Sequence, residues 1–203
     1  RRLTNLVGDL IHLSRLQGDQ PLESARVVDV DDVVREAIDS VRTAATKDEI
    51  ELAVGGRNGL RVFGVEDQLV TALRNLLANA ISYSPPQTKV AVGVAERDGI
   101  VNITVTDQGM GIPAADLERI FERFYRIDPA RSRMTGGTGL GLAIVKHVCN
   151  NHGGDVTVWS VEGEGSTFTL RFPAYRENKR GTGAVEAPVL HAELLENVDE
   201  RRG

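Results

Sequence analysis

The stretch Arg74–Tyr83 reads RNLLANAISY, and its alternation of apolar and polar positions decides how the middle of the chain folds. Leucine and alanine recur here with a helical period that begins near Glu66. Pro85 and Pro86 follow, and proline cannot extend a helix. We therefore predict one amphipathic helix over residues 66–83 with a buried apolar face.

Asn75 and Asn79 lie on the polar side of this helix. Because four residues turn a helix by only about 40° beyond a full turn, the two carboxamides stack one above the other. Taken alone, the pair is most simply a solvated surface stripe. Asparagine is a poor helix former, however, so two in one stripe favour a binding role. An amide oxygen is a neutral hard ligand of the kind that suits Mg²⁺.

The order of the remaining elements predicts the fold class. Outward from the central helix, we predict further helices at 31–46 and 140–151 and strands at 27–30, 49–54, 60–63, 89–95, 100–107, 155–161 and 166–172. This order lacks the regular strand and helix alternation of a doubly wound sheet. It fits an α/β fold of two layers, a sandwich in which a mixed sheet carries helices on one face.

The two ends of the chain differ from this middle part. Leu3, Leu6, Leu10 and Leu13 form a heptad seam, which fits a helix packed on its own domain as well as one that pairs with others in a bundle. We divide the chain into a helix at 1–17, a linker at 18–26, a globular domain at 27–175 and a disordered tail at 176–203. Since the chain begins with Arg1, we expect it to be a soluble piece of a longer protein.

Composition excludes several classes of protein. Of the 203 residues, 41% are hydrophobic, which is enough for a core, and the single cysteine, Cys149, cannot form an intrachain disulfide. The net charge of −5 gives no general attraction to nucleic acid or an anionic membrane, so any phosphate site must be local. We find no apolar run of roughly 18–20 residues that could span a bilayer.

A second group of candidate residues, DQGMGIP at Asp107–Pro113, follows a predicted strand directly. With a period of two, Asp107 lies on the same face as the valines and isoleucine of that strand, so its carboxylate points toward the core and needs a partner. Gly109 and Gly111 allow a tight turn that approaches a ligand closely. A plain turn is one alternative; a dinucleotide fingerprint is disfavoured, because Pro113 starts no long apolar helix.

A third group, GGTGLG at Gly136–Gly141, leads into the predicted helix at 140–151. A glycine-rich turn before a helix presents free N–H groups and the positive end of the helix dipole to an anion such as phosphate. It is not a P-loop, because no Lys-Ser/Thr pair follows the last glycine. A flexible hinge is the alternative. Arg126, Arg131 and Arg133 lie just upstream and could close over phosphates.

Five motifs in this order resemble the bacterial sensor histidine kinases of two-component systems, over about residues 1–173. They are Asn75-Leu-Leu-Ala-Asn79-Ala with Tyr83-Ser-Pro85; Asp107-x-Gly109-x-Gly111-Ile; Ile120-Phe-Glu-Arg-Phe124-Tyr-Arg126; Gly137-Thr-Gly-Leu-Gly-Leu142; and Gly163-Glu-Gly165-Ser-Thr-Phe168. The resemblance implies the Bergerat-type ATP-binding fold shared with gyrase, Hsp90 and MutL.

The resemblance also implies roles for individual residues. Asp107 would accept a hydrogen bond from the adenine amino group, Asn79 would hold the Mg²⁺ that bridges the phosphates, and Asn75 would assist in catalysis. Arg131 would act on the phosphates as a lid arginine, since Ser82 stands where the family usually has lysine or arginine. Further nucleotide contacts are expected from Ser82, Tyr83, Gly109, Gly111, Ile112, Phe124, Gly137, Thr138, Gly139, Leu140, Gly141, Leu142 and Thr167, the last under the adenine.

The activity that follows from the resemblance is transfer of the γ-phosphoryl group of Mg-ATP to a histidine, for relay to a response regulator. The acceptor would lie outside this chain, because His12 lacks the acidic context of the family's acceptor. The helix at 1–17 would be the second helix of a dimerisation hairpin, in a homodimer whose parent is anchored in the bacterial inner membrane and places this domain in the cytoplasm. A related ATPase, or a non-catalytic nucleotide-binding scaffold, are the alternatives.

One further cluster in the sequence is His147, Cys149 and His152. On a single helix these three side chains diverge, so we interpret them as core and surface residues instead of a metal site.

Overall fold

A computed structural model of the chain describes residues 24–127 and 138–177. Its strands are β1 (Arg26–Asp29), β2 (Glu51–Gly56), β3 (Arg61–Gly64), β4 (Lys89–Arg97), β5 (Ile100–Thr106), β6 (Asp155–Val161) and β7 (Gly165–Pro173). Its α-helices are α2 (Val30–Lys47), α3 (Glu66–Tyr83) and α5 (Gly141–Asn151), and two short 3-10 turns, η1 (Ala114–Asp116) and η2 (Arg119–Phe121), follow β5. The predicted ranges of α3 and β6 are confirmed residue by residue.

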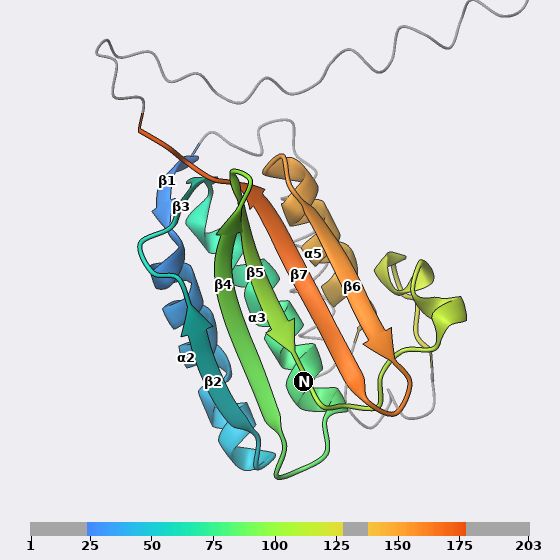
Figure 1. Cartoon of the computed structure of the whole chain (residues 1–203). Coiled ribbons are helices and arrows are strands. Elements are labelled where there is room, and N and C mark those ends of the chain that lie inside the picture. Colours follow the sequence, from blue (N-terminus) through green and yellow to red (C-terminus); the bar gives the residue numbers. More distant parts are fainter. Residues whose placement is uncertain (1–23, 128–137, 178–203) are drawn as a thin grey trace, which may run out of the picture.

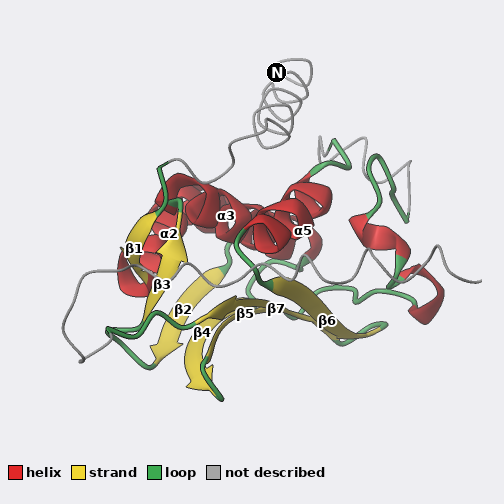
Figure 2. Cartoon of the chain, turned by 90° about the horizontal axis from the view of Figure 1, so that it is seen from above, coloured by secondary structure: helices red, strands yellow, loops and turns green. Residues whose placement is uncertain are grey.

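Five of the strands form one mixed sheet, in the order β2-β4-β5-β7-β6. β2 pairs with β4 in parallel, and the other neighbours are antiparallel. All three α-helices cover one face of this sheet, as Figures 1 and 2 show. β1 and β3 form a separate antiparallel pair beside α2. The predicted two-layer α/β sandwich is therefore confirmed.

The core fills the space between the sheet and the helices. Val101, Ile103 and Val105 of β5 are buried at every second position, because successive strand residues point to opposite faces. α3 buries Leu73 and Leu77 against them, as its apolar period predicts. The same alternation along β5 carries on to Asp107, which is buried on the helix side of the sheet.

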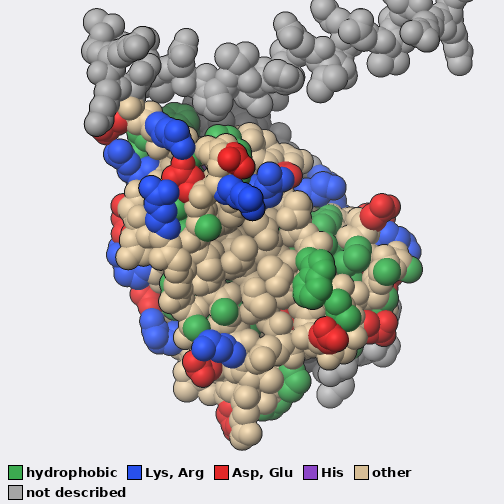
Figure 3. Space-filling view, viewed as in Figure 1, with side chains coloured by type: hydrophobic (Ala, Val, Ile, Leu, Met, Phe, Trp, Pro, Cys, Tyr) green, Lys and Arg blue, Asp and Glu red, His purple; other side chains and the backbone are tan. Residues whose placement is uncertain are grey.

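Among the described residues, no helix covers the outer face of the sheet. Figure 3 shows that charged side chains gather near the ends of the strands, while the middle is neutral and an apolar patch lies toward β6. Trp159 and Val161 of β6 are exposed large apolar residues, and Trp159 is 65% exposed. No helix within residues 24–127 and 138–177 has the length and hydropathy required to cross a membrane.

Candidate functional site

The predicted asparagine stripe lies on the surface of α3, as expected. Asn75 and Asn79 are half-buried, while the leucines on the opposite side are fully buried. Nδ2 of Asn75 donates a hydrogen bond to the carbonyl of Thr71 at 3.0 Å. This bond occupies the amide nitrogen and leaves Oδ1 directed away from the helix backbone. Among the described residues, the side chain of Asn79 has no hydrogen-bond partner, so its amide oxygen is available to a ligand.

The glycine-rich start of α5 lies against Asn75. A Cβ atom placed on Gly141 would lie 3.4 Å from Oδ1 of Asn75, so the two helices meet there at ordinary van der Waals distance. Leu140, the residue before the helix, is fully buried, and no side chain of residues 24–127 or 138–177 caps the free N–H groups of the first turn. The hydroxyl of Thr138 accepts a hydrogen bond from the Leu140 N–H at 3.3 Å. The helix start therefore presents unpaired backbone donors beside the asparagines.

Asp107 lies immediately after β5 and is 8% exposed. Its Oδ1 atom accepts hydrogen bonds from the N–H of Gly109 at 2.8 Å and from the N–H of Ser166 at 3.2 Å. Burial raises the pKa of the Asp107 carboxyl above its ordinary value of 3.8, and these two N–H groups partly oppose the shift. Both bonds go to Oδ1, so Oδ2 can accept a hydrogen bond from outside the chain.

The glycines of the Asp107 turn permit close backbone approach. A Cβ atom on Gly109 would lie 2.7 Å from the carbonyl oxygen of Tyr83, at the end of α3. Gly111 has a φ of +69°, and a Cβ atom there would lie 2.1 Å from the carbonyl oxygen of Val161. Neither position can hold a side chain without moving the backbone. The turn is thereby held between the C-terminal end of α3 and the end of β6.

These contacts bring the three predicted groups together along α3. The Asp107 turn meets the helix at Tyr83, and the start of α5 meets it at Asn75. Eight residues of α-helix separate these two points, which is about 12 Å along the axis. Asn79 lies between them on the same stripe. One ligand can therefore contact a buried carboxylate at one end and a helix start at the other.

Two phenylalanines lie in the described residues between the Asp107 turn and residue 127, and they differ in their contacts. Phe121 packs edge to face on Phe168, with ring centroids 6.4 Å apart. Phe124 has a φ of +64° and is 58% exposed, so it does not pack in the core. Its N–H donates to the carbonyl of Gly139 at 2.9 Å, close to the start of α5.

The structure locates the other candidate residues as follows. Ser82 and Tyr83 are exposed in the last turn of α3. Leu142 packs partly against the core, and the N–H of Ile112 donates to the hydroxyl of Ser160 at 2.9 Å. Arg131 and Gly137, predicted for the lid and the phosphate loop, lie outside the described residues.

The structure does not bring the side chain of Thr167 to Asp107. β7 buries Phe168, Leu170 and Phe172 toward the helices, so Thr167 lies on the outer face of the sheet. Its hydroxyl lies 3.0 Å from that of Thr106, the residue opposite on β5.

Ser166 is the residue of this strand that reaches Asp107, and the sequence analysis missed it. Besides the backbone contact, its buried hydroxyl lies 2.9 Å from that of Ser160. The sequence does predict this position. Ser166 is two residues before Phe168 and so lies on the same, inner face of β7 as Phe168 and Phe172.

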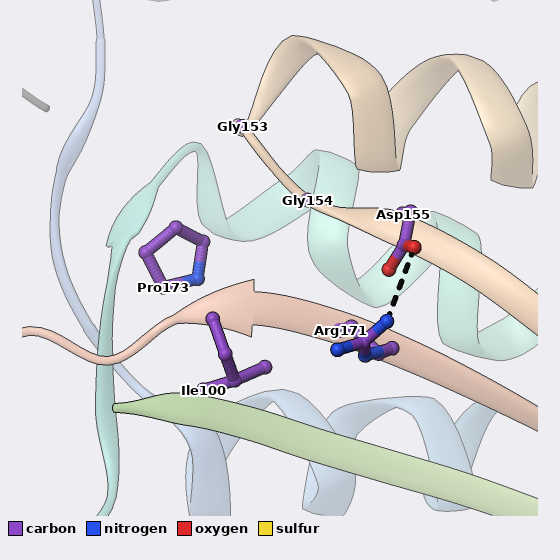
Figure 4. A pocket seen from close by; sticks show the side chains of 6 residues that line it. All are labelled: Ile100, Gly153, Gly154, Asp155, Arg171 and Pro173. Atoms are coloured by element: carbon purple, nitrogen blue, oxygen red, sulfur yellow. Dashed lines mark hydrogen bonds and ion pairs between the residues drawn. The ribbon is translucent and has the colours of Figure 1, made fainter. Parts of the chain in front are cut away.

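Two hollows in the described surface lie away from these three groups. One, of about 290 Å³, is lined by Ile100, Gly153, Gly154, Asp155, Arg171 and Pro173, and Figure 4 shows the ion pair of Asp155 with Arg171 inside it. Ile100 begins β5 and Asp107 follows its end, so this hollow lies at the opposite end of the sheet. The other, of about 490 Å³, lies over small side chains of β2, β4 and β5 on the outer face.

His147, Cys149 and His152 are divided between the core and the surface, as the sequence predicts. Cys149 and His152 are buried, and His147 is half-buried on α5. Burial raises the pKa of the Cys149 thiol to about 12, so it stays protonated. In the part of the chain that the structure describes, no group of three or more histidine, cysteine or acidic residues could hold a metal ion.

Comparison with known proteins decides the family. A sequence profile described as "Histidine kinase-, DNA gyrase B-, and HSP90-like ATPase" matches residues 64–176. The chain belongs to this family. The matched residues of the histidine kinase-like ATPase domain include α3, the Asp107 turn and α5, which are the three elements that meet at the candidate site.

Several curated relatives of this domain are sensor histidine kinases. "Sensor-like histidine kinase SenX3" of Mycolicibacterium smegmatis is 52% identical over 200 residues, which cover 98% of this chain and 50% of the relative. "Sensor histidine kinase RppB" of Synechocystis is 39% identical over 176 residues, covering 86% of this chain and 39% of the relative. The chain thus spans half or less of the length of these relatives.

Solved structures agree with this assignment. The mycobacterial sensor histidine kinase MprB is 34% identical, with a TM-score of 0.65 over 73% of this chain and 97% of that one. Full-length ShkA in complex with AMPPNP is 29% identical, with a TM-score of 0.73 over 85% of this chain and 36% of that one. The chain therefore carries the catalytic ATP-binding domain of the sensor histidine kinase type.

Proposed function

We propose that this domain binds Mg-ATP along α3 and passes its γ-phosphoryl group to a histidine supplied by another part of a sensor kinase. The proposal rests on the meeting of three groups along α3. The Asp107 turn contacts this helix at Tyr83, and the start of α5 contacts its asparagine stripe at Asn75. The adenine lies at the Asp107 end and the phosphates at the Asn75 end.

Asp107 has the chemistry to select adenine. Its Oδ1 is occupied by two backbone donors, and Oδ2 is free to accept the exocyclic amino group of adenine. Guanine has a carbonyl oxygen at that position, which an ionised carboxylate repels. The N–H of Ser166 and the close backbone at Gly109 hold the carboxylate in a fixed orientation.

The other end of α3 suits phosphate and a divalent cation. The uncapped N–H groups of α5 and its dipole favour negative charge. Asn79 would hold Mg²⁺ through its unpartnered amide oxygen, with Asn75 beside it, and such an oxygen fits the hard cation. Mg²⁺ held there would supply positive charge against the phosphates. Thr138, Gly139 and Leu142 would line the phosphates, with Arg131 closing over them.

Phosphoryl transfer to a protein nitrogen fits the stripe better than hydrolysis does. A ring nitrogen of the acceptor histidine attacks the γ-phosphorus, the bond to the bridging oxygen breaks, and ADP leaves with the electron pair. Hydrolysis needs a base to activate water, and the stripe of α3 offers two neutral amides at Asn75 and Asn79. A related ATPase is therefore the less favoured alternative.

The remaining parts of the proposal concern the whole protein. We propose that the parent kinase is a homodimer through a helical hairpin whose second helix is residues 1–17, with a linker at 18–26 and a tail at 176–203. Its phosphorylated histidine would pass the group to a response regulator. We place this domain in the cytoplasm of a bacterium, with membrane anchoring by segments outside this chain.

The test combines the chain with a separately made dimerisation hairpin that contains an acceptor histidine and with γ-labelled ATP. We expect acid-labile, alkali-stable label on the hairpin, and none when its histidine is replaced by glutamine. Sustained phosphate release without a hairpin would instead support the ATPase. ATP binding without either reaction would support a non-catalytic nucleotide-binding scaffold.

A further inference from the structure

His152 joins the two helices that form the candidate site. It follows the last residue of α5 and is 6% exposed. Its Nδ1 atom lies 2.7 Å from the carbonyl oxygen of Val148, one turn back in α5. Its Nε2 atom accepts a hydrogen bond from the N–H of Val65 at 3.0 Å, and Val65 is the residue that precedes α3. One imidazole ring therefore connects the end of α5 to the start of α3.

The two hydrogen bonds fix the protonation state of the ring. The Val65 N–H can only donate, so Nε2 must be the unprotonated nitrogen. The proton of the neutral ring is then on Nδ1, where it faces the Val148 carbonyl. A second proton on Nε2 would point at the N–H of Val65 and break that bond, because two donors would face each other.

The surrounding residues leave the ring no other position. A Cβ atom on Gly64 would lie 2.3 Å from Cδ2 of His152, so only glycine fits beside the ring. The ring of Phe172 also packs edge to face with the imidazole, with centroids 6.1 Å apart. A protonated ring therefore cannot rotate to another partner without moving α5 or α3.

This contact lies at one end of a helix pair whose other end forms the proposed phosphate site. The start of α3 meets the end of α5 at His152, and Asn75 of α3 meets Gly141 at the start of α5. The two helices are thus antiparallel, and about 15 Å of helix separates the two contacts. A shift of one helix along the other at His152 changes the spacing between Asn75 and Gly141.

We propose that His152 is a positioning residue for nucleotide binding: the neutral ring fixes α3 relative to α5, and its protonation weakens ATP binding at the other end of the pair. This inference rests on the proposed function for the location of the phosphates. Its own content, the connection between His152 and the Asn75–Gly141 contact, does not depend on which reaction follows.

The charge state of His152 follows from its surroundings. Burial lowers the pKa of the imidazole below its ordinary value of 6.5, and the hydrogen bond to Val148 partly opposes this shift. The titratable or charged side chains on the elements packed around the ring are Arg61, Glu66, Asp67, Lys146, His147, Asp155 and Arg171. The ring is therefore neutral at pH 7 and takes up a proton only in more acidic solution.

The first experiment measures ATP affinity by calorimetry from pH 5 to pH 8 for the wild-type chain and for His152→Gln. A glutamine oxygen can accept from the Val65 N–H and does not titrate, so it is the conservative replacement. On acidification, we expect the ATP affinity of the wild type to fall about threefold to tenfold more than that of His152→Gln. This difference corresponds to the loss of one neutral hydrogen bond. His147→Gln, on the same helix, should keep the wild-type pH profile. Superimposable profiles for wild type and His152→Gln would overturn the proposal.

The second experiment uses only the wild-type chain, so that a misfolded variant cannot obscure the result. An NMR titration follows the His152 ring and the amides of Val65, Asn75 and Gly141. We expect all four to share one midpoint, and saturating ATP to lower that midpoint, because coupling between proton and ATP binding is reciprocal. ATP that binds without moving the midpoint contradicts the inference. Failure of ATP to bind at all contradicts the proposed function, and the shared midpoint still tests the helix coupling.

Discussion

The Cβ position of Gly141 lies 3.4 Å from Oδ1 of Asn75, and this contact joins the glycine-rich start of α5 to the asparagine stripe of α3. The two residues are 66 positions apart in the chain. Their meeting places free backbone N–H groups beside two carboxamides, which is the arrangement that an Mg-phosphate group requires.

Gly141→Ala should raise the melting temperature and weaken ATP binding. Gly141 is the first residue of α5, and its conformation and the space beside Asn75 both accept a methyl group. Alanine has fewer conformations than glycine in the unfolded chain, which stabilises the folded state by about 0.4–1 kcal/mol. The added methyl group occupies the point where phosphate approaches the backbone. Thermal unfolding and calorimetry check the two effects. Asn150→Ala, exposed near the end of the same helix, should stabilise without affecting ATP binding; a similar loss in that variant would contradict the explanation.

Asp107→Asn should weaken ATP binding about tenfold to a hundredfold, the range expected for a lost hydrogen bond to a charged group. The variant can keep Oδ1 against the N–H groups of Gly109 and Ser166, which leaves its amide nitrogen facing the adenine amino group. Calorimetry with ATP measures the change. Thr167→Val, on the outer face of the sheet, is the control and should bind ATP as the wild type does. Unchanged affinity of Asp107→Asn would refute the adenine assignment.

The pH dependence of stability should also change in Asp107→Asn. Burial raises the folded-state pKa of Asp107 above 3.8. Between pH 3.8 and this raised pKa, the folded state therefore binds more protons than the unfolded state. Asp107 therefore lowers stability as the pH rises from about 3.8 through its raised pKa, and above that the loss is complete. Denaturant unfolding of both proteins at several pH values measures it. The stability of the variant relative to wild type should increase across this window; a constant difference would be evidence against a raised pKa.

Asn79→Ala should remove the Mg²⁺-dependent part of ATP affinity. The side chain has no hydrogen-bond partner among the described residues, so its loss should change stability little. ATP affinity measured with excess Mg²⁺ and again with a chelator separates the two contributions. We expect a several-fold loss with Mg²⁺ and no loss without it. Asn102→Ala, on the outer face of β5, is the matched control. Equal losses under both conditions would assign Asn79 to the nucleotide instead of the metal ion.

Gly111→Ala should destabilise the fold much more than Gly163→Ala. Both glycines have a positive φ, so both variants bear the backbone strain. Only at Gly111 does the new methyl group meet backbone, at 2.1 Å from the carbonyl oxygen of Val161, whereas the space at Gly163 is open. We expect an extra cost of about 1–3 kcal/mol, from urea unfolding. Equal costs would show that the Asp107 turn can move away from β6.

Local periodicity was sufficient to predict most of the elements. The apolar period and the two prolines after it predict α3 with its observed bounds, Glu66–Tyr83. The alternation of β5 predicts the inward side of Asp107, which is buried. Thr167 was predicted from its position in a motif, without regard to the alternation of the strand. The alternation places Thr167 on the outer face and Ser166 on the inner face, beside Asp107.

The amino-acid sequence by itself determined the elements, the face that each one buries and the three groups of polar and glycine residues, because these depend on contacts within a few residues. Only the tertiary structure decided that the Asp107 turn meets Tyr83, that Gly141 meets Asn75 and that His152 joins α5 to α3. Those contacts depend on the order of strands in the sheet and on the packing of helices across it. Residues 65 and 152, or 75 and 141, become neighbours only when the whole core forms.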